Sequence, residues 1–288
     1  MLLGLASGLS WGVADFFGGL QSRKVPALAV ALWSQVAGGI TLLAVLGVVG
    51  GLPPLPGVLW GAGAGLFSGV AVAMFYRALA AGVMSVVAPI SACGAAVPVV
   101  VGLFAGRVPT GPQGIGLAFV FCGIVLVSLA TGGGAEEPRE EGSSTGWLTV
   151  PNLMLALGSA AGFGAFYVLV DAGSAAGGSP LWTIAGARAG SLSVLLTAIL
   201  AAPRSAAPWP GARRMPAVAA VGVLDTTANA LFAFAAAAGN LAVAAVLGSM
   251  YPVATALLGR VLLGERLSLL QAVGVAFALV GVVLVSIP

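Results

Sequence analysis

The sequence predicts an all-α integral membrane protein in which ten transmembrane helices form a 5+5 inverted repeat. The first observation is composition: 7% of the 288 residues are charged and 60% are hydrophobic, whereas a soluble domain carries about 25% charged residues. The second is that apolar runs of roughly 18 residues or more recur from end to end, each long enough to cross a bilayer core. The third is that the two halves of the chain resemble each other. Together these observations exclude an ordinary soluble fold.

Helices, rather than the strands of a barrel, are the predicted spanning elements. In lipid every backbone amide must be bonded within the protein, so only helices and closed barrels cross a membrane. A barrel requires short segments of alternating polarity, and the apolar runs here are long and continuous. Breaks at charged, proline-rich or glycine-rich points give ten predicted spans: 2–20, 27–50, 58–80, 83–105, 114–131, 150–171, 180–201, 216–237, 240–262 and 269–287.

A hydrophilic segment divides the chain into two predicted domains. Residues 132–149 contain four glutamates and an arginine among glycines and serines, a composition typical of a flexible linker. We therefore expect a first repeat over residues 1–131 and a second over residues 150–288. No basic region precedes Leu2, so we expect the first apolar run to remain as the first span rather than to be removed as a signal peptide.

Three pairs of segments match in the same order in the two halves. The pairs are 4–12 with 156–164, 75–86 with 232–243, and 113–128 with 271–286. Such ordered self-similarity indicates an internal repeat. Because each repeat contains an odd number of spans, the second must enter the membrane in the opposite orientation, as in many secondary transporters.

Small residues and basic residues give two further predictions. Gly61, Gly65 and Gly69 follow one another at four-residue spacing, which favours close contact with a neighbouring helix. Lys24 is the only lysine beside ten arginines, a usage typical of GC-rich bacterial coding, so we predict a bacterial inner-membrane protein. Cytoplasmic termini would place most of the basic loops outside, against the positive-inside rule, so the charge count favours both termini outside.

Charged and polar residues inside the spans are the candidate functional residues, because a charge at the bilayer centre costs about 2.5–3.5 kcal/mol. Asp15 lies in the first span, and Asp225 lies in the eighth, with Asn229 one turn later on the same face. Gln35 and Arg188 occupy equivalent positions in the second and seventh spans. These five residues are candidates for ion coupling or substrate binding.

The sequence leaves alternative roles open for these residues. In a functional role, Asp15 and Asp225 face a central cavity, where they exchange protons or bind a cationic group of a substrate. In a structural role, Asp15 lies at the interface near Arg23, and Asp225 forms an ion pair with Arg188. Arg188 is also a candidate partner for a substrate carboxylate, because guanidinium and carboxylate form bidentate pairs.

Aromatic residues and prolines within the spans form a second set of candidates. An aromatic residue can line a cavity with an apolar surface and a polar group, or it can anchor or pack a helix; these candidates are Trp11, Trp33, Tyr76 and Tyr251. A proline frees a backbone carbonyl and interrupts a helix, where transporters often bind substrate; these candidates are Pro89, Pro98 and Pro252.

Several functional classes are excluded by what the sequence lacks. The chain contains no histidine, which excludes a serine–histidine dyad, and we predict neither catalytic residues nor enzymatic activity. It also lacks a phosphate-binding loop with a lysine, so it cannot energise transport with ATP. Cys93 and Cys122 lie far apart in apolar runs, which indicates neither a disulfide nor a metal site. No cofactor is predicted, and a net charge of +3 is too small to indicate nucleic-acid binding.

The sequence resembles the drug/metabolite transporter superfamily, and within it the EamA-type transporters with two EamA domains. The resemblance covers nearly the whole chain. It rests on ordered motifs: Trp11-Gly12, the segment 80–89 (AAGVMSVVAP), the segment 248–252 (GSMYP), the segment 264–267 (GERL), Gly274 and Gly281-Val282. The C-terminal block is the most specific of these.

The resemblance implies ten helices, a central cavity between two repeats, and transport of small metabolites such as amino acids, amines or related compounds. It also implies cytoplasmic termini, in contrast to the charge count. The sequence departs from the family pattern at three positions. Arg107 and Gly94 stand in the first half where Glu265 and Pro252 stand in the second. Asp15 replaces what is commonly a small or amide residue, which makes it a candidate specificity determinant.

The leading functional hypothesis is therefore a secondary transporter that works by alternating access, with export favoured over uptake and protons as candidate coupling ions. The expected partners are a small-molecule substrate and the lipid bilayer, and the oligomeric state is left open. Two other hypotheses stay open from the sequence: a passive channel lined by small residues, and a membrane scaffold that transports nothing.

Overall fold

The structure, a computed structural model, describes residues 1–22, 24–81, 91–106, 108–131, 150–177, 179–201, 209–239, 241–262 and 269–285. All regular elements within these residues are helical. They are α1 (Leu2–Ser22), α2 (Ala27–Val49), α3 (Leu55–Ala81), η1 (Cys93–Ala95), α5 (Ala96–Phe104), α6 (Gly111–Thr131), α7 (Val150–Ala175), α8 (Pro180–Ala201), α9 (Met215–Ala237), α10 (Leu241–Gly248), α11 (Tyr251–Leu262) and α12 (Leu269–Val285). The predicted all-α fold class is confirmed for these residues.

Eight of the predicted spans correspond to single helices with bounds within a few residues of those expected. Within the described residues, five stretches have the length and hydropathy of a membrane span: Leu28–Val49, Leu55–Phe75, Leu153–Ala175, Pro180–Ala201 and Met215–Ala237. The two remaining spans are less regular. In the fourth, the described part is the 3₁₀ turn η1 followed by α5, and in the ninth, α10 ends at Gly248 and α11 begins at Tyr251.

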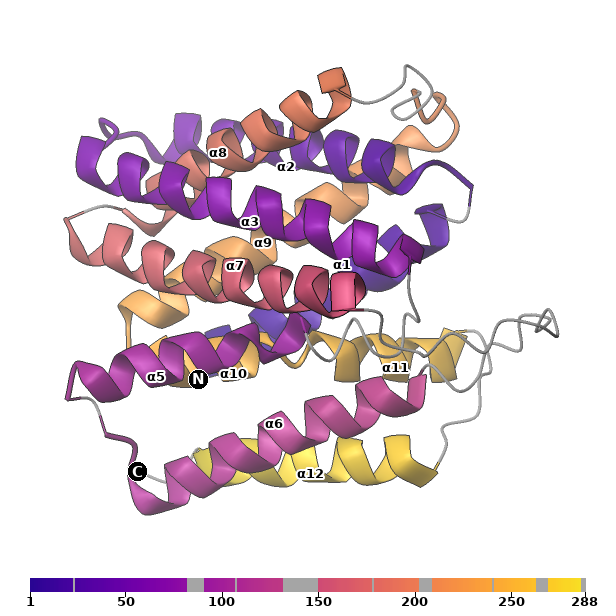
Figure 1. Cartoon of the computed structure of the whole chain (residues 1–288). Helices are drawn as coiled ribbons and strands as arrows, with labels where there is room; N and C mark the ends of the chain where they lie inside the picture. The colour runs from indigo at the N-terminus through magenta and orange to yellow at the C-terminus, as the bar shows by residue number, and fades with distance from the viewer. Residues whose placement is uncertain are drawn as a thin grey trace, which may run out of the picture.

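The helices run side by side and alternate in direction (Figure 1). Helix α1 begins and α12 ends at one end of the bundle, whereas α6 ends and α7 begins at the other. The loop after α1 and the loop before α9 meet at this second end, where Arg214 Nη1 lies 3.5 Å from the backbone carbonyl of Lys24. Several basic side chains are therefore gathered at one end of the helices.

The helix contacts occur in pairs that correspond between the two halves. Helix α3, the third helix of the first half, packs against α8 and α7. Its counterpart α9, the third helix of the second half, packs in the same way against α2 and α1. Helix α6 packs against α12, the last helix of the other half. Each half is therefore built against the other rather than as a separate body.

Glycines bring the backbones of these helix pairs together. A Cβ atom added at Gly65 of α3 would lie 2.7 Å from the carbonyl carbon of Ala187 in α8. At Gly222 of α9, it would lie 2.7 Å from the carbonyl carbon of Ser34 in α2. Both distances are too short for a real side chain. The close helix contact predicted from the glycine spacing in α3 is confirmed at this position.

The contact between α6 and α12 is self-complementary. A Cβ atom added at Gly123 would lie 2.6 Å from the carbonyl oxygen of Gly274, and one added at Gly281 would lie 2.7 Å from that of Gly116. The rings of Phe119 and Phe277 stack across the same contact with centroids 4.9 Å apart. In the sequence match of 113–128 with 271–286, these residues correspond to one another.

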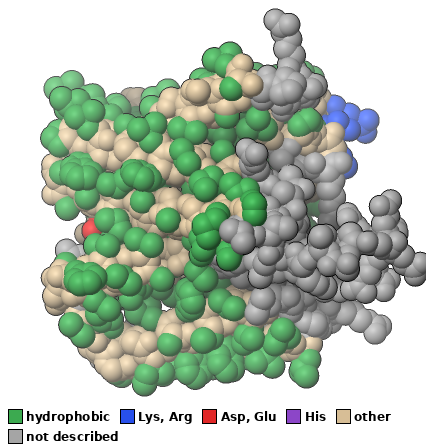
Figure 2. Space-filling model, viewed as in Figure 1, with side chains coloured by type: hydrophobic (Ala, Val, Ile, Leu, Met, Phe, Trp, Pro, Cys, Tyr) green, Lys and Arg blue, Asp and Glu red, His purple; other side chains and the backbone are tan. Residues whose placement is uncertain are grey.

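The outside of the bundle is apolar, as a lipid-facing surface requires. Figure 2 shows hydrophobic side chains across the described part of one face, with Lys and Arg side chains only near one end of the helices. Val48 is 89% exposed and Phe104 is 90% exposed. In water such a surface would be an aggregation site, whereas in a bilayer it contacts lipid.

We predict that Gly65→Ala destabilises the protein, because the added methyl group meets the backbone of α8 at Ala187. Overpacking of this kind costs about 1–3 kcal/mol, which thermal unfolding of the purified protein in detergent would detect as a lower Tm. Gly63→Ala is the matched control on the same helix, since an added Cβ there meets nothing within 4 Å. Equal melting temperatures for the two variants would contradict the prediction.

Candidate functional site

A cavity of about 200 Å³ lies inside the helix bundle and is lined from both halves of the chain. Its wall comes from α1, α2, α3, α7, α8 and α9, together with η1, the two residues before it, and residues around the break between α10 and α11. The polar lining residues are Asp15, Ser34, Gln35, Ser68, Ser91, Tyr167, Arg188, Ser191, Asp225, Asn229, Ser249 and Tyr251. A volume of this size suits a small metabolite rather than a drug-sized ligand.

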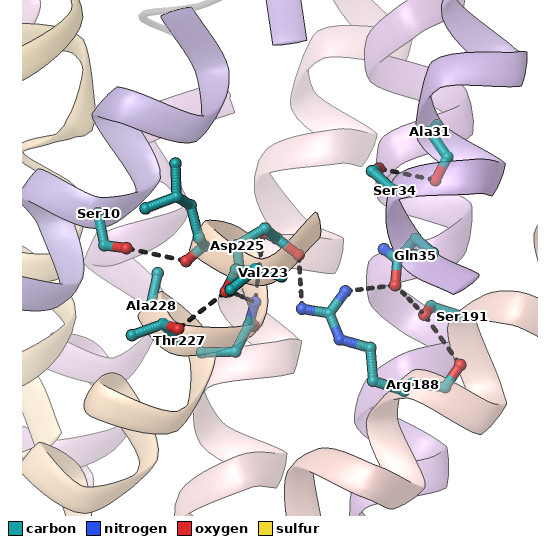
Figure 3. A network of polar contacts seen from close by, with 12 residues as sticks. Ser10, Ala31, Ser34, Gln35, Arg188, Ser191, Val223, Asp225, Thr227 and Ala228 are labelled. Carbon is teal, nitrogen blue, oxygen red and sulfur yellow. Dashed lines mark hydrogen bonds and ion pairs between the residues drawn. The ribbon is translucent and has the colours of Figure 1, made fainter. Parts of the chain in front are cut away.

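Arg188 is the centre of a hydrogen-bond network that joins three helices (Figure 3). Its Nη2 atom lies 2.5 Å from Asp225 Oδ2 in α9, and its Nη1 atom donates to Gln35 Oε1 in α2. Ser191, one turn after Arg188, donates to the same Gln35 oxygen at 3.3 Å. The side chain of Arg188 is 7% exposed and that of Asp225 is 31% exposed. The ion pair proposed from the sequence is therefore present, with its carboxylate at the cavity wall.

Asn229 bonds directly to Asp225, and two serines of α1 bond to the helix that carries it. Asn229 Nδ2 donates to the backbone carbonyl of Asp225 at 2.6 Å and to its Oδ1 atom at 3.3 Å. Ser7 and Ser10 of α1 donate to the backbone carbonyls of Ala228 and Leu224, each at 2.8 Å. These bonds hold α1 against α9, so the helix that carries Asp15 is tied to the helix that carries Asp225.

Asp15 lines the same cavity but does not belong to the Arg188 network. Its side chain is exposed to the cavity, and its charge interacts with that of Asp225. Among the residues that the structure describes, no hydrogen-bond donor or cation is bonded to Asp15. The structural alternative for Asp15 involves Arg23, which lies outside the described residues.

Aromatic side chains form the apolar part of the wall. Trp11 lies on α1 one turn before Asp15, with its ring centroid 6.1 Å from that of Tyr167 and 6.0 Å from that of Phe232. Tyr251 also lines the cavity. Trp11 and Tyr251, both expected as cavity candidates, are thus brought together with the polar residues.

Two other aromatic candidates lie elsewhere or are not described. Trp33 packs with Val25, Ala29 and Val30, and its ring meets that of Trp209 edge to face at 4.6 Å. It is not among the described residues that line the cavity, so the structure favours the packing alternative. Tyr76 lies in α3, and its side chain is outside the described part of the chain.

The three proline candidates have different positions. Pro252 is the second residue of α11, directly after the break at Ser249 and Met250, as expected for a residue that interrupts a helix. Pro98 is buried in the first turn of α5, after the 3₁₀ turn η1, so the irregularity precedes it. Pro89 lies outside the described residues.

The polar lining residues that the sequence reasoning missed are Ser34, Ser68, Ser91, Tyr167, Ser191 and Ser249. Tyr167 lies within 3.3 Å of the Ser249 hydroxyl, oxygen to oxygen. Ser91 and Ser159 share a hydrogen bond of 2.6 Å, and Ser91 lines the cavity. The repeat contained a usable signal: extending the match of 4–12 with 156–164 places Tyr167 opposite Asp15.

The same correspondence pairs the charged residues with uncharged ones. Gln35 corresponds to Arg188, and the match of 75–86 with 232–243, extended toward the N-terminus, pairs Ser68 with Asp225. All four side chains line the cavity. The two halves thus contribute equivalent positions with different chemistry.

Known proteins agree with this architecture. A model of the EamA-like transporter family matches residues 1–129 and again residues 151–287. Among solved structures, 29 chains match, one of them 20% identical to this chain with a TM-score of 0.76, covering 99% of this chain and 94% of its own. At that identity the likeness shows the fold alone. No curated protein matches. Because the family model covers nearly all of the sequence, this chain belongs to the EamA-like transporter family, whose members are multi-pass membrane proteins.

Proposed function

We propose that this protein is a secondary transporter that moves a small metabolite across a bacterial inner membrane by alternating access, with export favoured over uptake. The observation that carries the proposal is the cavity. Three charged side chains of the described part of the chain line it, although an ionised group inside a membrane protein is costly and commonly marks a substrate or ion pathway.

An inverted 5+5 repeat supplies the symmetry for alternating access. We propose that residues 1–131 and 150–288 are the two repeats, with ten spans in all and residues 132–149 as their linker. The correspondence of the α3–α8 and α2–α9 contacts and the self-complementary α6–α12 contact support this assignment. In alternating access, one set of contacts is closed while the equivalent set is open. When the two sets exchange these states, the cavity opens toward the opposite side of the membrane.

The hydrogen-bond network of Arg188 joins helices that move when these contacts open and close. It connects α8 to α2 and α9, and the glycines at the α2–α9 and α3–α8 contacts give these helices smooth, closely packed surfaces. Opening the bundle between α8 and α9 separates Arg188 from Asp225. Substrate or a proton can then interact with the carboxylate while the ion pair is broken.

A double-variant cycle separates the structural and functional roles of this ion pair. Asp225→Ser removes the partner of the buried Arg188, and we expect a loss at the lower end of about 3–5 kcal/mol, because the Asp225 side chain is 31% exposed. Combining Asp225→Ser with Arg188→Gln gives the second half the residue types that stand at the equivalent positions of the first half, Ser68 and Gln35. This double variant should regain most of the lost stability. Thermal unfolding measures both effects.

The functional part of that prediction concerns flux into proteoliposomes. A panel of radiolabelled amines and amino acids first identifies a substrate with saturable uptake in the wild type. The double variant should fold and yet transport that substrate at least about tenfold more slowly, since the site has lost its charge-assisted contacts. Normal flux in the double variant would assign the ion pair a structural role alone.

We also predict that proton coupling depends on Asp15, the cavity carboxylate outside the Arg188 network. An inwardly or outwardly directed pH gradient should change wild-type flux, and Asp15→Asn should make flux independent of the gradient. Asp171→Asn is the matched control, since Asp171 also lies in a helix but not among the described residues that line the cavity. A gradient response that persists in Asp15→Asn would exclude Asp15 as the coupling residue.

A further inference from the structure

The charges around the cavity do not cancel. Its charged lining residues, within the described part of the chain, are Asp15, Arg188 and Asp225. Arg188 is committed through both terminal nitrogens, one to Asp225 and the other to Gln35. Its positive charge is therefore neutralised by Asp225, and Asp15 is left as an acidic group without a cation among these residues.

Asp15 is positioned for a ligand that enters the cavity. Its side chain is exposed in a space lined by both halves, and α1 is held in place by the bonds of Ser7 and Ser10 to α9. A carboxylate of this kind accepts hydrogen bonds from an ammonium group, and such charge-assisted bonds are stronger than neutral ones.

Aromatic rings line the same cavity as Asp15 and offer a surface for a cation with an apolar body. Trp11 lies four residues before Asp15, on the same face of α1, and packs against Tyr167. Phe75 and Phe163 of α3 and α7 also line the cavity, with ring centroids 6.2 Å apart. Aromatic faces attract cations and bury apolar groups.

We propose that the cavity binds a small organic monocation, a primary amine with an apolar body and no carboxylate. The ammonium group binds Asp15, and the apolar body packs against Trp11 and Tyr167. A carboxylate on the ligand is disfavoured, because Arg188 is already paired with Asp225 and the remaining charge of the described lining, that of Asp15, is negative. Zwitterionic amino acids are therefore poorer ligands than the matching amines.

This inference rests on the proposed transport function for its physiological meaning, but its test measures binding alone. Benzylamine, phenylglycine and benzyl alcohol form a matched set of probes. Phenylglycine is benzylamine with an added carboxylate, and benzyl alcohol replaces the ammonium group with a neutral hydroxyl. Isothermal titration of the purified full-length protein in detergent gives the dissociation constant of each probe.

We expect benzylamine to bind about tenfold or more tightly than either phenylglycine or benzyl alcohol. Benzyl alcohol lacks the charged donor that bonds to Asp15, and the carboxylate of phenylglycine is repelled by the acidic lining. Asp15→Asn should weaken benzylamine binding by about the same factor. Asp171→Asn is the control and should bind benzylamine as the wild type does. The comparison of the three probes on the wild-type protein requires no variant to fold.

The inference is overturned if phenylglycine binds as tightly as benzylamine, if benzylamine does not bind, or if Asp15→Asn leaves its binding unchanged. Failure of the transport proposal has a different signature. Saturable flux of an anionic or neutral metabolite with no binding of benzylamine overturns the monocation site and leaves the transporter. Benzylamine binding that depends on Asp15, with no saturable flux of benzylamine or of the panel compounds, overturns the transporter and leaves the site.

Discussion

Neutralising the charge of one buried arginine is the constraint on which the arrangement of this protein depends. Arg188 lies inside an apolar bundle, where an unpaired guanidinium would be too costly to keep. Its partners come from two other helices, Gln35 from α2 and Asp225 from α9. Meeting that requirement holds α8 against both helices and places the Asp225 carboxylate at the cavity wall. The same bonds that stabilise the bundle leave Asp15 as the acidic group available to a ligand.

Much of the fold could be predicted because the bilayer requires long apolar helices with internally bonded backbones. The bounds of α2, α8 and α9 differ from the predicted spans by at most one residue at either end. The break between α10 and α11 could not be located from hydropathy, since residues 240–262 form one apolar run. Pro252 indicated an interruption, but the two residues that leave the helix, Ser249 and Met250, precede it.

The charged and amide residues of the candidate site could be selected from the sequence for the same energetic reason, whereas aromatic lining residues could not be told from packing residues. Polar groups are rare in apolar spans and therefore stand out in the sequence. All five of the polar candidates line the cavity: Asp15, Gln35, Arg188, Asp225 and Asn229. Aromatic residues give no such signal. Trp11 lines the cavity and Trp33 packs in a separate cluster, although both lie within apolar spans. Tyr167 was identifiable only by comparing the two halves residue by residue.

The contact between α6 and α12 has the self-complementarity of an isologous interface, in which equivalent residues meet across an axis. Phe119 stacks on Phe277, its counterpart. A substitution at either position alters one shared contact, so the two halves are constrained to change together there. The cavity also brings counterparts together, because Arg188 donates a hydrogen bond to Gln35, but there the two residues differ in chemistry. Counterparts thus meet as identical residues at the periphery and as different residues at the centre, which allows a symmetric framework to acquire an asymmetric specificity.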